Sequence, residues 1–363
     1  MRTLHIMVFL LLSSVFFYAC HHNQIDIGFI ACISGVHHDL GNEVENGVLI
    51  ACDEYNKATK GDKINLVIRD DKQNDNEIKK IIKEFSDKGI KNVLGPVTSS
   101  MAITMIETAP KDMFALSPTV STHYLSGKED NFFRIFTSQQ NISYVIADSM
   151  INDSEDTTII MDESNLAFSQ STLDTFRDEF EKKGGKIQQV ITINSIKGVD
   201  YKRIMEDLLK KNPKTLFLIA NPVDTAILCQ HIRKNKLGSK IYLTNWSLAG
   251  DLFRYGGKAV NDVIFFLSTD IKGKSFQKFK EKYKKYYNDE PTFAASFGYE
   301  AMNVYISAIK ENKQDESLKE TILRISEFQG IDGKFKIDKY GDVKRKVYKY
   351  TIRDNDYLRL ENN

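Results

Sequence analysis

Short apolar runs alternate with amphipathic segments of helical period from residue 25 to residue 244. The runs that predict strands are 25–33, 64–68, 91–94, 113–116, 158–161, 187–193, 216–220 and 241–244. The segments that predict helices are 76–88, 99–109, 168–183, 201–211 and 223–234, with one more after Asn42, where Glu45 holds the capping-box position. Such alternation builds right-handed crossovers and mostly parallel sheets that are covered on both faces. We therefore expect an α/β protein.

The strands are too numerous for one compact core in a chain of 363 residues, so we expect two α/β domains. The C-terminal end has a different pattern. Residues 333–337 and 346–352 are strand-like and flank the segment 338–342, which has the composition of a turn. This arrangement predicts a hairpin-like turn.

The N-terminal segment 1–19 has the layout of a secretory signal, with a basic start and an apolar run at 6–18 that is short for a membrane span. The run ends in Phe-Tyr-Ala-Cys, which resembles the lipobox of bacterial lipoproteins. The resemblance implies that Cys20 becomes lipid-modified and that 20–24 is the tether. The alternative is ordinary signal cleavage, with Cys20 an incidental thiol.

The remaining cysteines, Cys32, Cys52 and Cys229, form no CxxC pair. Each lies at the end of a predicted strand or on an apolar helix face, so we interpret them as small buried hydrophobes. A disulfide in an export compartment stays an alternative.

The charge balance argues against nucleic acid as a partner. Lys and Arg number 50 against 49 Asp and Glu, a formal net charge of +1, so no strong field is available to hold a polyanion.

Sequence motifs give little support to an enzyme. HExxH, GxSxG and GxGxxG do not occur, and the phosphate-loop-like segment before Ser275 has Ser268 where a glycine is required. His37 and His38 are adjacent in a predicted loop, and we interpret both as solvated rather than as metal ligands. We expect no catalytic activity, no cofactor and no metal site.

Two predicted strand ends carry dense small hydroxyl residues, in segments 95–100 and 117–122. In parallel α/β sheets, ligands sit at the carboxyl ends of strands, where helix N-termini offer free N–H groups. Free amides together with Ser and Thr hydroxyls make a neutral cradle for a carboxylate or similar oxyanion. The alternative is that these residues only cap helices and form turns.

Several segments occur in an order typical of one family. They are Ile27-Gly28-Phe29-Ile30, Asp70-Asp71, Gly95-Pro96-Val97-Thr98-Ser99, Ser117-Pro118-Thr119, Phe132-Phe133-Arg134, Gly298-Tyr299-Glu300-Ala301 and Phe328-Gln329-Gly330-Ile331-Asp332-Gly333. Over nearly the whole mature chain, this set resembles the periplasmic binding proteins of the Leu/Ile/Val type, the solute receptors of ABC importers. The resemblance implies two Rossmann-like lobes with parallel central sheets, joined by a three-crossing hinge. The lobes are expected at 25–140 plus 250–328 and at 141–249 plus 329–363.

The resemblance also implies ligand contacts. Ser99 matches the serine that contacts the ligand carboxylate, and Thr119, Val120 and Ser121 match the triplet whose backbone and hydroxyl hold the carboxylate and α-amino group. Leu40 matches a lid residue in the first loop, and Phe168 aligns with a tyrosine that closes over the ligand. Asn221 lies on the loop after the next second-lobe strand, which also faces the cleft, and Trp246 is expected as a cleft wall that stacks on an apolar or aromatic ligand. No acid lies near Trp246, where amino-acid binders have one to pair the ligand ammonium. Either another acid such as Asp270 compensates, or the ligand is not a zwitterionic amino acid. Trp246 is alternatively a core anchor.

The expected function is that of an extracytoplasmic receptor that closes on a small carboxylate- or amide-containing ligand and delivers it to the ABC permease. The protein is expected to be an exported monomer, attached to the cell membrane or outer membrane through its lipid. The alternative is a lipoprotein of the same fold that senses a ligand or regulates an envelope enzyme without transport.

Overall fold

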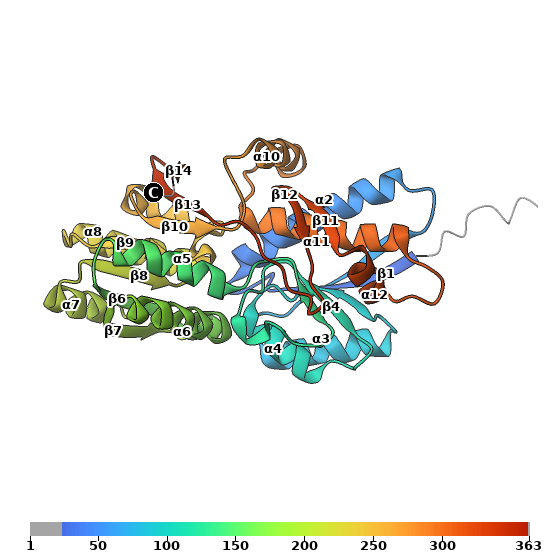
Figure 1. Ribbon diagram of the computed structural model, residues 1–363, viewed down its shortest axis with the longest axis horizontal. Helices are drawn as coiled ribbons and strands as arrows, with labels where there is room; N and C mark the ends of the chain where they lie inside the picture. The colour runs from blue at the N-terminus through green and yellow to red at the C-terminus, as the bar shows by residue number, and fades with distance from the viewer. Residues whose placement is uncertain (1–23, 362–363) are drawn as a thin grey trace, which may run out of the picture.

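The computed structural model describes residues 24–361, so the predicted signal peptide and Cys20 lie outside the described residues. Two lobes are visible, each built on its own sheet (Figure 1). The strands of the first lobe are β1 (Gln24–Ala31), β2 (Lys63–Asp70), β3 (Asn92–Leu94), β4 (Phe114–Ser117) and β5 (Phe132–Arg134). They are ordered β2-β1-β3-β4-β5, and every pair is parallel. The predicted α/β class is confirmed.

The second lobe has a seven-stranded sheet of order β14-β13-β10-β9-β8-β6-β7. Its strands are β6 (Asp156–Asp162), β7 (Lys186–Ile193), β8 (Thr215–Ile219), β9 (Lys240–Leu243), β10 (Ile264–Leu267), β13 (Tyr348–Arg353) and β14 (Asp356–Leu360). The pairs from β7 to β10 are parallel, and β13 and β14 are added antiparallel. A separate antiparallel pair consists of β11 (Glu327–Gly330) and β12 (Gly333–Lys336).

Helices cover both faces of the first sheet. They are α2 (His38–Ala58), α3 (Asp75–Asp87), α4 (Ser99–Thr108), α11 (Phe293–Glu311) and α12 (Leu318–Ile325). Strand β1 alternates between two cores: Phe29 joins the core that contains α2 and α11, and Ile30 joins the one that contains α3 and α4. Gly28 permits this packing, because a Cβ there would lie 2.4 Å from the ring of Phe85.

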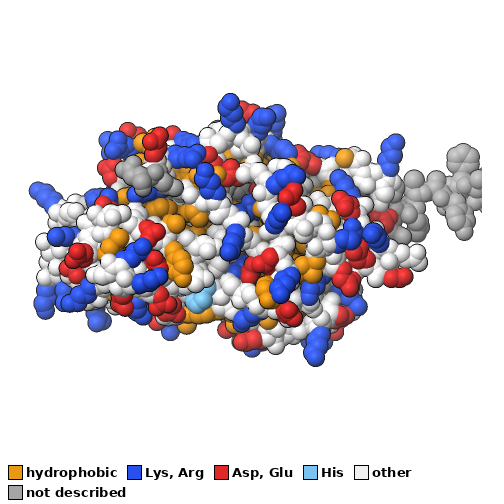
Figure 2. Space-filling view, in the orientation of Figure 1, with side chains coloured by type: hydrophobic (Ala, Val, Ile, Leu, Met, Phe, Trp, Pro, Cys, Tyr) orange, Lys and Arg blue, Asp and Glu red, His pale blue; other side chains and the backbone are white. Residues whose placement is uncertain are grey.

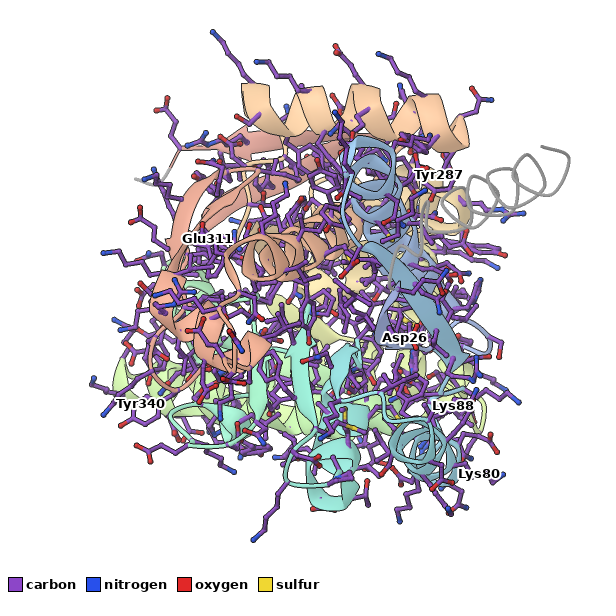
Figure 3. All side chains as sticks on the ribbon, turned by 90° about the vertical axis from the view of Figure 1, so that its right-hand side faces the viewer. Asp26, Lys80, Lys88, Tyr287, Glu311 and Tyr340 are labelled. Carbon is purple, nitrogen blue, oxygen red and sulfur yellow. The ribbon has the colours of Figure 1, made fainter. Side chains whose placement is uncertain are left out.

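The helices of the second lobe are α5 (Gln139–Ile151), α6 (Leu166–Lys182), α7 (Tyr201–Lys211), α8 (Pro222–Lys234) and α9 (Leu252–Gly256). One more helix, α10 (Lys274–Tyr287), lies along the edge of the molecule at the junction of the lobes (Figure 1). Its residues Phe279 and Tyr283 pack on Ile50 of α2 and Ala295 of α11. The end view shows α10 above α2, with Tyr287 at their junction (Figure 3).

Helix α3 shows why the spacing of apolar residues predicts the bounds of an element closely. Its predicted bounds of 76–88 differ by one residue from the observed ones. Asn74 caps the helix by accepting hydrogen bonds from the backbone N–H groups of Asn76 and Glu77. The apolar stripe of Ile78, Ile81, Ile82 and Phe85 is buried.

The start of α2 differs from the prediction. The helix begins at His38, so Asn42 and Glu45 lie inside it and form no capping box. Leu40 therefore lies in the first turn of α2 and not in a loop. The early start is compatible with the fold because Gly41 abuts Cys32, the residue after β1, where a Cβ would lie 2.0 Å from the Cys32 carbonyl oxygen.

The chain passes between the lobes three times, after β5, after β10 and after β12 (Figure 1). Strand β10 departs from the expected division, which placed 250–328 in the first lobe. It pairs parallel with β9 and antiparallel with β13, so it belongs to the second sheet. Its four residues are all buried, because it is an inner strand covered on both faces.

The hairpin-like turn predicted near the C-terminus is present, but its flanking strands do not pair with each other. Strand β12 pairs with β11, and β13 pairs with β10 and β14, so the two predicted partners lie in different sheets. The turn itself exists, with an isolated antiparallel bridge between Ile337 and Val343. The segment 338–347 is the third crossing between the lobes.

Cys32, Cys52 and Cys229 are free and buried, as predicted. Among residues 24–361, no helix is long and apolar enough to cross a membrane. Acidic and basic side chains are interspersed over the face seen in Figure 2, and basic side chains gather over α10 at its edge.

Candidate functional site

The carboxyl ends of the parallel strands of both sheets meet at the junction of the lobes, and the lobes touch there. Asn165, just before α6, accepts hydrogen bonds at its Oδ1 from the backbone N–H and the hydroxyl of Ser100, both at 3.1 Å. The hydroxyl of Ser100 in turn accepts from the backbone N–H of Ala167 at 3.2 Å. Since the side chain of Thr98 does not cap α4, Asn165 supplies from the other lobe an acceptor that the helix lacks.

A second set of contacts joins the short helix at 123–125 to α6. Both the backbone N–H of His123 and its Nδ1 lie within hydrogen-bond distance of Ser171 Oγ, at 2.9 and 2.7 Å. Tyr124 donates its hydroxyl to Asp174 at 2.6 Å. These hydrogen bonds hold the two lobes together, and His37, Ser121 and Trp246 are buried near their junction.

The first lobe contributes the ends of β3 and β4, which lie side by side as the parallel pairing requires. Ser99 is the first residue of α4, and its hydroxyl accepts from the backbone N–H of Thr122 at 3.4 Å. Ser121 Oγ is buried and has no hydrogen-bond partner among residues 24–361. The structure thus brings together the two predicted hydroxyl loops and leaves one hydroxyl in them unengaged.

Thr119 and Val120 are used differently. The Thr119 hydroxyl donates to the carbonyl of Val97 at 2.6 Å, and the Val120 N–H donates to the Ser117 hydroxyl at 3.2 Å. The Val120 side chain belongs to the core beneath α3 and α4. These hydrogen bonds therefore stabilise the loop, whereas the hydroxyl of Ser121 has no partner among residues 24–361.

The second lobe contributes an aromatic wall. Phe168, in the first turn of α6, and Trp246, after β9, meet edge to face with ring centroids 5.6 Å apart. Both side chains are buried. Leu40 of the first lobe is buried in the same continuous apolar cluster.

His37 is the residue that sequence reasoning misplaced. Its side chain is 2% exposed, and its ring centroid lies 5.1 Å from that of Trp246, across the lobe junction. Neither ring nitrogen has a partner among the described residues. Burial lowers the pKa of His37 to about 4, although the carboxylate of Asp162 opposes this shift. The sequence feature that could have indicated this burial is the position of His37 shortly after β1, at the carboxyl end of a parallel strand.

Asp162 and Asn221 of the second lobe lie at or just after the carboxyl ends of β6 and β8. Asn221 caps α8 through the N–H of Asp224, and its amide donates to Asp224 at 2.5 Å and to Asp162 at 3.3 Å. Asp162 also accepts from the N–H groups of Ser164 and Ser195, at 2.9 and 3.2 Å. The amide of Asn221 is thus committed to two carboxylates.

Asp270, the acid considered as a partner for a ligand ammonium, is already paired. It accepts from the hydroxyl of Tyr350 at 2.7 Å and from the guanidinium of Arg359 at 2.6 Å. Its charge is therefore balanced within the second lobe.

Two other features lie beside the cleft. A groove of about 820 Å³ runs under α10, and its lining includes Glu43, Phe276 and Tyr357 but none of the predicted ligand contacts.

Within the described chain, His38, Asp39 and Asp251 place their ligand atoms within 4.8 Å of one another. His38 Nε2 already lies 3.0 Å from a carboxylate oxygen of Asp39, and we assign no metal to this cluster.

Comparisons with known proteins agree with this architecture. A model of the periplasmic binding protein family matches residues 24–356. A Leu/Ile/Val-binding protein of Rhizobium johnstonii is 28% identical over 183 residues, which are 48% of this chain and 49% of that protein. The match thus spans about half the length of this curated relative.

Solved structures with low identity share the fold. The branched-chain amino acid transporter substrate binding protein of Streptococcus pneumoniae, in complex with isoleucine, superposes with a TM-score of 0.84 at 17% identity, covering 93% of this chain and 100% of that one. A solute binding protein of an ABC transporter from R. palustris, in complex with benzoate, gives a TM-score of 0.84 at 17% identity, covering 93% and 96%. The family match covers nearly all of the described chain, and the two-lobed fold agrees with it. The chain therefore belongs to the periplasmic binding protein family.

Proposed function

We propose that the protein is an extracytoplasmic solute receptor that closes on a small carboxylate- or amide-containing ligand and delivers it to an ABC importer. One observation carries the proposal. Both lobes have buried polar atoms near their junction that lack hydrogen-bond partners among residues 24–361, among them Ser121 Oγ and the ring nitrogens of His37 in the first lobe and Asn245 Oδ1 in the second. Because buried polar atoms are nearly always hydrogen-bonded, a polar ligand between the lobes accounts for this set.

The comparisons support the same class of ligand. The two solved neighbours were crystallised with isoleucine and with benzoate, and both of these molecules carry a carboxylate. In this proposal, Ser99 and Ser121 donate to such a group, and Phe168, Trp246 and Leu40 supply the apolar contacts. Thr119, Val120 and Asn221 then position the loops.

Export and attachment belong to the same proposal. Membership in a periplasmic binding protein family implies an extracytoplasmic location. We propose that 1–19 is the signal peptide, that Cys20 carries the lipid, and that the protein acts as a monomer on a membrane permease. Binding, closure and release need no catalytic step, and we propose none.

The binding experiment combines a ligand search with two serine variants. The mature protein, refolded to remove carried-over ligand, is screened by thermal shift against amino acids, amides and aromatic acids. A ligand present at a hundred times its dissociation constant stabilises the folded state by about 2.7 kcal/mol. Hits are then titrated by calorimetry against the wild type, Ser99→Ala, Ser121→Ala and the double variant.

Loss of a hydroxyl donor to a charged ligand oxygen should weaken binding by about ten- to a hundredfold. Ser86→Ala, an exposed serine on α3, is the matched control and should bind normally. Unchanged affinity in the double variant would show that the cradle is elsewhere. Uptake of the radiolabelled ligand is then measured in cells that lack the chain. A role in transport predicts that these cells lose uptake, whereas a role in sensing predicts that they keep it.

A further inference from the structure

Two groups of buried polar atoms that lack partners within residues 24–361 lie near the lobe junction. One lies at the end of β4, where the backbone N–H of Gln139 donates to the carbonyl of Ser121 at 2.6 Å and the Gln139 amide has no partner among residues 24–361. The other surrounds Trp246: its neighbour in sequence is Asn245, whose Oδ1 is unpartnered, and the ring that packs on it is His37. The first group can complete an oxyanion cradle. The second group calls for a different ligand moiety.

The imidazole of His37 sets the chemistry of that moiety. Burial keeps the ring neutral at neutral pH, so one nitrogen donates a hydrogen bond and the other accepts one. Asn245 Oδ1 adds a further acceptor. An ammonium group could not accept from the imidazole N–H, and a carboxylate could not donate to the ring nitrogen or to Asn245. A hydroxyl or a carboxamide can do both.

The cost of burying a charge also favours an uncharged group at this position. A buried ammonium is costly unless a carboxylate pairs with it. Two nearby carboxylates are already engaged: Asp162 accepts from the N–H groups of Ser164 and Ser195 at Oδ1 and from the Asn221 amide at Oδ2, and Asp270 is paired with Arg359. Asp71 Oδ2 is unpartnered within the described residues, but burial raises the pKa of Asp71 to about 7, since no cation lies against it.

We propose that His37 contacts the ligand directly and selects a small acid whose second polar group is an uncharged hydroxyl or carboxamide. Such a ligand places its oxyanion at Ser99, Ser121 and Gln139, and its neutral group against His37 and Asn245. The receptor would therefore prefer a hydroxy acid to the α-amino acid of the same skeleton. This inference rests on the proposed receptor function.

Matched ligand pairs test the inference by calorimetry on the refolded mature protein. The first pair is 2-hydroxy-4-methylpentanoate and leucine, which differ in hydroxyl against ammonium. The second pair is 4-hydroxybenzoate and benzoate, which differ in hydroxyl against hydrogen. We expect the hydroxy compound of at least one pair to bind tenfold or more tightly than its counterpart, and we expect leucine to bind no more tightly than its hydroxy analogue.

Variants of His37 identify the contact. His37→Phe keeps a ring against Trp246 and should weaken the hydroxy compound at least tenfold, while His37→Gln, which keeps a donor and an acceptor, should recover part of that loss. His38→Phe is the matched control, because the His38 side chain is 45% exposed, and it should bind normally. Melting curves on each variant separate lost contact from lost folding.

Three results would overturn the inference. Tighter binding of leucine than of its hydroxy analogue would do so while leaving the receptor function intact, and loss of that leucine binding in Asp71→Asn would identify the ammonium partner. Equal binding of the hydroxy compound by the wild type and His37→Phe would exclude the contact. Absence of binding by all four compounds would exclude this ligand class, and the broader screen of amino acids and amides would then decide the receptor function separately.

Discussion

A buried ion pair at the hinge gives the sharpest test of how the lobes are held. Arg345, in the third crossing, donates to Glu300 of α11 at 2.7 Å and to the carbonyl of Ile135, in the first crossing, at 2.9 Å. The side chains of Arg345 and Glu300 are only 6% and 4% exposed. The guanidinium also lies 4.0 Å from the ring centroid of Phe335. One cation thus ties two of the three crossings to the first lobe.

Glu300→Gln removes the charge with little change of shape. The new amide oxygen can still accept from the N–H of Ile331, which Glu300 does at 2.5 Å, so the loss falls mainly on Arg345. Breaking a buried pair by neutralising one partner costs about 3–5 kcal/mol, because the other charge stays buried without compensation. We expect the free energy of unfolding to fall by about that amount. The double variant with Arg345→Met should be less destabilised than Glu300→Gln alone, since it buries no unpaired charge.

Urea unfolding, followed by circular dichroism and by the fluorescence of Trp246, the single tryptophan, measures both quantities. Asp87→Asn is the matched control, because its pair with Lys83 on α3 is exposed at 63% and 76% and should contribute about 0–1 kcal/mol. A loss below about 1 kcal/mol in Glu300→Gln, or no recovery in the double variant, would refute the reasoning.

Three other features give further tests. Because burial raises the pKa of Asp71 to about 7, the native state binds a proton there that the unfolded state has lost, so the contribution of Asp71 to the free energy of unfolding should fall as the pH rises from about 4 to about 7; Asp71→Asn should remove this contribution, and identical pH profiles of the wild type and the variant would contradict the assignment. Asn165→Ala removes the acceptor of two interlobe hydrogen bonds, so small-angle scattering should report a more open molecule, whereas Asn235→Ala, an exposed amide bonded only within its helix, should leave the profile unchanged. Cys20→Ala should move the protein from membranes to the soluble fraction, and unchanged membrane association would exclude the lipid anchor.

Much of the local structure was predictable, since helix and strand periods are written in consecutive residues. The helix at 201–211 agrees with α7 at both ends, and the one at 76–88 agrees with α3 within one residue. The start of α2 was missed, because Asn42 and Glu45 have the composition of a cap while the helix is extended by packing against β1. Local composition cannot report that packing.

Part of the site was predictable for a related reason. In a parallel sheet, a strand end followed by a helix is recognisable in sequence, and this placed Ser99 and Ser121 in adjacent loops. The contacts of Thr119, Val120 and Asn221 with their own lobe were not predictable, because each depends on where neighbouring carbonyl and carboxyl oxygens lie.

The sequence by itself determined the α/β alternation and the hydroxyl-rich strand ends, because each depends on the spacing of residues that are close in the chain. Only the tertiary structure decided that β10 joins the second sheet, that His37 is buried against Trp246 and that Asn165 completes the N-terminus of α4. These features join segments that are distant in the chain, and their energies come from desolvation and hydrogen bonding across the lobe junction. The local sequence around His37 does not reveal whether its side chain is exposed or buried. The side chain is buried because the second lobe packs against it.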